Sequence, residues 1–93
     1  MASKFSSAMY AADAGSTDAY VITLSPVPSA YSTGMMVIFK ANTANTGAAT
    51  LNVNSLGAKT IVKDGSVTLA NSDIAASQIV IVIYDGTNFQ LIE

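Results

Sequence analysis

The sequence predicts an all-β fold, a small antiparallel β-sandwich or barrel-like domain of about six to eight short strands. Glycine, proline and polar turn residues divide the chain into short segments that are rich in β-branched and aromatic residues. No segment keeps a helical spacing of apolar residues over three turns. The length of 93 residues suits one domain.

The first part of the chain differs in composition from the rest. Residues 1–17 are mostly serine, alanine and glycine, and after Met1 their only large apolar side chains are Phe5, Met9 and Tyr10. This composition is typical of an N-terminal arm that orders on a partner, or of a loose terminus. We therefore expect one β domain over residues 18–93, preceded by the arm.

Alternation of apolar and polar side chains marks the first strands. Residues 20–24 place Tyr20, Ile22 and Leu24 on one face, and the prolines that follow end the strand because they cannot donate to a ladder. Residues 35–40 form a second strand that is largely apolar on both faces. A polar loop then leads to the alternating residues 50–54.

The pattern continues with a hairpin partner at residues 59–63 and a short strand at 67–69. Residues 71–76 are predicted to form one helical turn, because Asn71 and Ser72 are both good helix caps.

The strongest local signal is at the C-terminus. Residues 78–84 and 87–92 are two strand-like runs joined by Asp85-Gly86, the preferred sequence for a two-residue hairpin turn. The first run is apolar on both faces, which is typical of a central, buried strand. We therefore expect Ile81 to be buried.

The composition argues against an enzyme. The chain has no histidine, cysteine or arginine, and its only glutamate is Glu93. The carboxylates that remain as candidates for acid-base chemistry or calcium binding are Asp13 with Asp18 and Asp64 with Asp73. Turn and capping roles explain these residues better. We expect no catalytic residue, no cofactor and no metal site.

Charge and hydropathy narrow the partners. Four lysines and a net charge of -2 argue against nucleic acid, and no apolar run is long enough for a membrane helix or a secretion signal. Only 11% of residues are charged while 51% are hydrophobic, whereas about 25% charged is usual for soluble domains. A neighbouring protein subunit is therefore expected to cover part of the surface.

Two groups of residues are candidates for contact with partners. The candidate subunit interface consists of Phe5, Met9, Tyr10, Tyr20, Tyr31 and Met36. Core positions explain its tyrosines equally well. The candidate receptor loop consists of Asn42, Thr43, Asn45 and Thr46, whose polar side chains suit a glycan but also suit an ordinary soluble turn.

Five segments resemble a module of bacteriophage tail-fibre and related virion proteins. They are DAYVITL at 18–24, MMVIFKA at 35–41, NTGAATLNVN at 45–54, LGAKTI at 56–61 and YDGTNFQL at 84–91.

The resemblance implies a non-enzymatic virion structural protein that is made in the host cytoplasm. It also implies a homotrimer that attaches to other virion proteins of the capsid or tail, as a tail-fibre domain, a capsid decoration protein or a head fibre. The alternative is an adhesion module that binds a glycan or protein on the bacterial surface.

Overall fold

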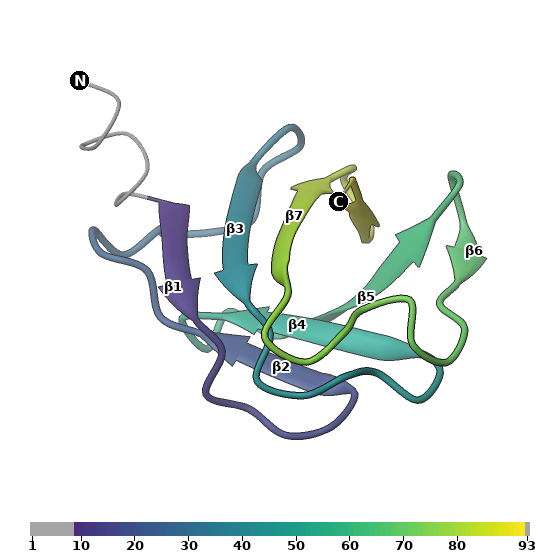
Figure 1. Ribbon diagram of the computed structural model, residues 1–93. Coiled ribbons are helices and arrows are strands. Elements are labelled where there is room, and N and C mark those ends of the chain that lie inside the picture. Colours follow the sequence, from purple (N-terminus) through teal and green to yellow (C-terminus); the bar gives the residue numbers. More distant parts are fainter. Residues whose placement is uncertain (1–8, 93) are drawn as a thin grey trace.

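The computed structural model describes residues 9–92, and their regular structure is eight strands in one sheet, in agreement with the predicted all-β class (Figure 1). The strands are β1 (Tyr10–Ala12), β2 (Ala19–Ile22), β3 (Met36–Lys40), β4 (Ala49–Val53), β5 (Ala58–Lys63), β6 (Val67–Thr68), β7 (Ile79–Tyr84) and β8 (Phe89–Leu91). In this part of the chain, no helix is long and apolar enough to cross a membrane.

The sheet is mixed, so the predicted antiparallel arrangement holds for only some of the strand pairs. The strand order is β1-β3-β7-β8-β5-β4-β2, and β6 pairs with the side of β5. The pairs β1 with β3, β2 with β4, and β5 with β8 are parallel. Parallel partners need long crossover connections, and here those connections contain other strands. The alternation of apolar and polar side chains along a strand does not indicate which distant strand will pair with it.

The sheet closes nearly into a barrel, because the chain just after one edge strand, β1, reaches the other edge strand, β2. In Figure 1, β1, β3 and β7 stand side by side while β2 and β4 run beneath them. The chain after β1 then reaches β2: the Ala14 amide donates to the Val21 carbonyl at 2.8 Å. The carboxylate of Asp13 accepts from the Val21 amide at 2.9 Å. Residues 10–14 of the predicted arm therefore help to close the barrel.

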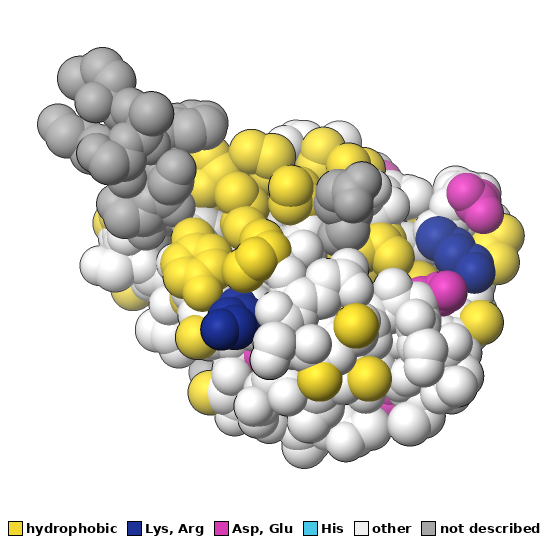
Figure 2. All heavy atoms as spheres, in the orientation of Figure 1, with side chains coloured by type: hydrophobic (Ala, Val, Ile, Leu, Met, Phe, Trp, Pro, Cys, Tyr) yellow, Lys and Arg dark blue, Asp and Glu magenta, His cyan; other side chains and the backbone are white. Residues whose placement is uncertain are grey.

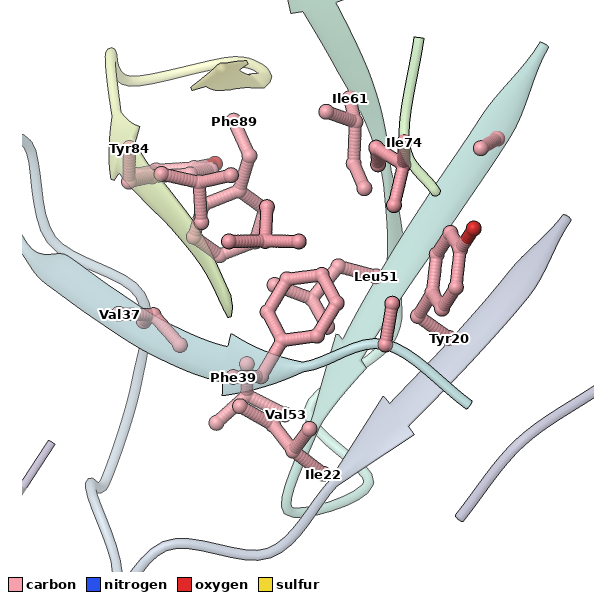
Figure 3. Packing of buried hydrophobic residues seen from close by; sticks show 14 of the residues in the cluster. Tyr20, Ile22, Val37, Phe39, Leu51, Val53, Ile61, Ile74, Tyr84 and Phe89 are labelled. Atoms are coloured by element: carbon pink, nitrogen blue, oxygen red, sulfur yellow. The ribbon is translucent and has the colours of Figure 1, made fainter. Parts of the chain in front are cut away.

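The barrel interior is filled by the inward side chains of six strands and by Ile74 from a loop (Figure 3). The Tyr20 and Phe39 rings lie 5.4 Å apart, and the Tyr84 and Phe89 rings 5.2 Å apart. Full burial of each such large side chain stabilises the fold by about 1.5–3 kcal/mol. The predicted inward positions of Tyr20, Ile22 and Leu24 are confirmed, since all three are buried.

The C-terminal hairpin has a different turn from the predicted one. β7 and β8 are antiparallel, with Tyr84 opposite Phe89 in the last pair. The connection is therefore four residues long, not the two of Asp85-Gly86. The Asp85 carboxylate accepts hydrogen bonds from the Thr87 and Asn88 amides, each at 2.8 Å, and so closes a longer loop. Residues 71–76 form turns and bends in place of the predicted helical turn.

Candidate interaction surface

One outer wall of the barrel is apolar, and it is formed by β1, β3 and β7. Along β3 and β7 the buried side chains alternate with outward ones. Those that point outward on these two strands are Met36, Ile38, Lys40, Ile79, Ile81 and Ile83. Ile81 is thus half-buried on the outside of the barrel, which corrects the expectation that it is a core residue.

The pairing of the strands joins these side chains into a continuous patch. Met36 lies opposite Ile83 and Ile38 opposite Ile81, while Tyr10 of β1 lies beside Ile38. The Ile92 amide donates to the Ile81 carbonyl at 2.8 Å, which adds a further isoleucine at the edge. We call this patch the isoleucine face, defined as Tyr10, Met36, Ile38, Ile79, Ile81, Ile83 and Ile92.

Over residues 9–92 the isoleucine face is partly open to solvent, since Met36, Ile38, Ile81 and Ile83 are half-buried and its other three members are exposed. Tyr10 is 39% exposed, Ile79 50% and Ile92 54%. Figure 2 shows hydrophobic side chains gathered over the part of the surface where Figure 1 places β1, β3 and β7. The only charged residue of these three strands is Lys40, at the end of β3.

The opposite wall has a different character. β4 and β5 present Thr50, Asn52 and Thr60 on their outer side, since their neighbours Leu51, Val53 and Ile61 are buried. The two walls therefore share the same apolar interior but differ in what they offer to solvent. Within residues 9–92, the outward apolar side chains of β3 and β7 are half-buried or exposed, because their strands pack on the core with the other face.

The predicted interface residues separate into two groups. Tyr10 and Met36 belong to the isoleucine face, and Met9 precedes it in a half-buried position. Phe5 lies outside the described residues. The other two are internal: Tyr20 is fully buried, and Tyr31 contacts the core near Tyr84 and Phe89.

Both internal tyrosines are fixed by hydrogen bonds to the backbone. The Tyr20 hydroxyl donates to the Thr43 carbonyl at 2.8 Å, and the Tyr31 hydroxyl donates to the Gly57 carbonyl at 2.6 Å. Burial raises the pKa of Tyr20 to about 12 and also raises the pKa of Tyr31. Both side chains support the fold, and Tyr20 presents no surface to a partner, whereas Tyr31 is half-buried.

Sequence reasoning missed five members of the face. They are Ile38, Ile79, Ile81, Ile83 and Ile92. The signal was present, because residues 35–40 and 78–84 are apolar on both faces. It was interpreted as burial of both faces within the fold.

The candidate receptor loop is largely internal. Asn45 is fully buried, and its side-chain amide donates to the carbonyls of Gly47 and Ala70, each at 2.8 Å. Its side-chain oxygen accepts from the Ile74 amide at 2.7 Å. Asn45 therefore joins two loops at one end of the barrel, and its hydrogen-bonding groups are occupied within the chain.

The other members of the receptor loop are more open. Asn42 and Thr46 are exposed, and Thr43 is half-buried. The Asp18 carboxylate accepts from both the amide and the hydroxyl of Thr46. The hydroxyl bond is the main cause of a lowered Asp18 pKa. Asn42 is thus the loop member with the most freedom to meet a ligand.

Two of the carboxylates that were weighed for acid-base or metal chemistry, Asp13 and Asp73, are held by contacts within the fold. Asp13 is buried and accepts three backbone N–H bonds, and Asp73 pairs with Lys63 at 2.8 Å. This ion pair lowers the pKa of Asp73 and raises that of Lys63. Over residues 9–92, no three acidic side chains gather where they could hold a metal ion.

Comparison with models of known protein families finds no match, and comparison with curated proteins finds none either. The resemblance to tail-fibre modules therefore depends on the sequence segments quoted above.

Proposed function

We propose that this chain is a non-enzymatic structural module of a bacteriophage virion, similar to the modules of tail fibres. It works as a homo-oligomer, a trimer by the resemblance, and attaches to other virion proteins of the capsid or tail. It is made in the host cytoplasm and functions on the particle. The observation that carries the proposal is the isoleucine face, which needs a protein neighbour to cover it.

The distribution of charge supports a protein partner over nucleic acid. Binding to a phosphate backbone needs clustered cations. Of the four lysines, Lys63 is paired with Asp73 and Lys40 stands alone among apolar side chains on β3. Neither of these two lysines belongs to a cluster of cations that could bind a phosphate backbone.

Location on the particle tests the proposal. Purified virions are imaged at a resolution that allows this chain to be fitted into the density. We expect copies of the barrel on the capsid surface, the neck or the tail, with subunit contacts around each copy. Absence of the chain from purified, infectious particles would contradict the proposal.

A second candidate is an adhesion module that binds a glycan or protein on the bacterial surface. It is favoured by the rigid loop end of the barrel, where Asp13 and Asn45 hold the loops and leave Asn42 exposed. Labelled protein is expected to bind intact host cells, and Asn42→Ala to weaken binding several-fold. Equal binding by this variant and the original chain would count against the loop as the receptor site.

A further inference from the structure

We infer that the isoleucine faces of neighbouring copies of this chain meet one another around the symmetry axis of the oligomer. The inference rests on the proposed function and deepens it, since it identifies both the contact surface and its occupant. The occupant is a second copy of the same barrel.

The charge distribution favours a second copy. The chain has a net charge of -2, so two copies repel each other unless their acidic groups stay apart. Asp13 is buried, and Asp18, Asp64, Asp73 and Asp85 all lie outside β1, β3 and β7. Among residues 9–92, the isoleucine face is therefore an apolar surface on which copies can approach with their acidic side chains away from the contact. Lys40 is exposed at the end of β3 and can remain in water.

The chemistry of the face points to the same occupant. Interfaces between transient partners resemble the rest of a protein surface, whereas permanent and homo-oligomeric interfaces are more apolar. Apart from the Tyr10 hydroxyl, the side chains of the isoleucine face offer no hydrogen-bond donor. Such a surface selects its partner by shape and apolar area, as subunits of one oligomer do.

The size of the molecule is compatible with this contact. The single chain has 4879 Å² of accessible surface. A standard interface covers about 800 Å² of each partner, which corresponds to roughly one-sixth of this surface.

Two single-cysteine variants test the inference, because the natural chain has no cysteine. Ile79→Cys places a thiol on the isoleucine face, where the native side chain is 50% exposed. The matched control, Val67→Cys, places one on β6, where the native side chain is 48% exposed. Alkylation of each thiol is timed in the assembled protein, in protein diluted to single chains, and in urea, and light scattering gives the mass of each variant.

In the assembled protein, the thiol at position 79 is expected to react on the order of tenfold more slowly than the one at 67, because it reacts only when the contact opens. In diluted protein the two rates should be similar. Should Ile79→Cys be monomeric while Val67→Cys remains assembled, position 79 is again shown to lie in the contact.

Other outcomes overturn the inference in distinguishable ways. An oligomer that reacts equally fast at both positions uses another surface, and the proposed function stands. A monomer in solution whose position 79 is protected only on the virion has a different virion protein as occupant. A monomer that is absent from the virion contradicts both the inference and the proposed function.

Discussion

Two polar side chains, Asp13 and Asn45, fix the loops at one end of the barrel. The Asp13 carboxylate accepts from the amides of Gly15 at 2.8 Å, Val21 at 2.9 Å and Asn42 at 3.0 Å. It thereby ties the end of β1 to β2 and to the loop after β3. Buried polar groups need such partners, and removing one partner leaves the others unsatisfied.

Asp13→Ala is expected to lower the free energy of unfolding by about 3 kcal/mol, because three amides lose a charged acceptor in a part-buried site. Urea denaturation measures the change. Asp64→Asn, in an exposed turn, is the control and should change stability by less than about 0.5 kcal/mol. Equal stability of Asp13→Ala and the original chain would show that the carboxylate does not hold the barrel closed.

Tyr20 should make the fold sensitive to alkali. Its pKa is about 12 in the folded chain, because burial disfavours the phenolate, and about 10 in an unfolded chain. The Tyr20 hydroxyl therefore keeps its proton to a higher pH in the folded state than in the unfolded state. Its contribution to the free energy of unfolding is complete below pH 10 and is lost as the pH rises towards 12.

The melting temperature followed from pH 9 to 12 measures this loss. Tyr20→Phe should lose less stability over the interval than the original chain, although it starts lower because the bond to the Thr43 carbonyl is gone. Identical alkaline profiles for the two proteins would contradict this assignment.

At the scale of elements, the connection between β1 and β2 closes the barrel, and it depends on Gly15. A Cβ atom at this position would lie 2.1 Å from the Ala19 carbonyl oxygen and 2.9 Å from the Val21 amide nitrogen. Both are backbone atoms, so the connection itself must move to admit a side chain.

Gly15→Ala is accordingly expected to lower the free energy of unfolding by about 1–3 kcal/mol, the usual effect of overpacking. Gly47→Ala is the matched control, since a Cβ there meets nothing within 4 Å. Chemical denaturation of the two variants side by side measures the difference. Similar stabilities would mean that the connection adapts without strain.

The strands themselves could largely be predicted, because alternation along each strand is a local property of the sequence. Residues 20–24, 35–40 and 78–84 correspond to β2, β3 and β7 within a few residues. Their partners could not be predicted, since β5 pairs in parallel with β8 across residues 64–88 and no local signal records that contact. The Asp85 loop was missed because its side chain, and not the Asp-Gly backbone, sets the loop length.

The candidate site could be predicted only in part, for a similar reason. Tyr10 and Met36 were selected by residue type and lie on the isoleucine face, whereas Tyr20, selected in the same way, lies in the core. A strand that is apolar on both faces fits two situations, a central strand covered by other layers or the wall of a barrel with an apolar outer side. The closure of the sheet places β3 and β7 in the second situation.

At the scale of the whole molecule, the two walls of the barrel differ. One presents Thr50, Asn52 and Thr60 to water, and the other presents the isoleucine face. Because every strand between them shares one core, a charged residue on either outer wall should leave the fold intact. Such a charged residue should disturb assembly only when it lies on the apolar wall.

Light scattering of the purified chain across a wide concentration range, alone and with two variants, tests this account most directly. Ile81→Lys puts a charge at the centre of the isoleucine face, and Val21→Lys puts one on the outer side of β2, where the native side chain is 39% exposed.

We expect the original chain and Val21→Lys to have about three times the 9.5 kDa mass of one chain, from three-fold cyclic assembly. Ile81→Lys should be a folded 9.5 kDa monomer with the circular dichroism of the original. A mass of 9.5 kDa for the original chain at every concentration, or an assembled Ile81→Lys variant, would contradict the account.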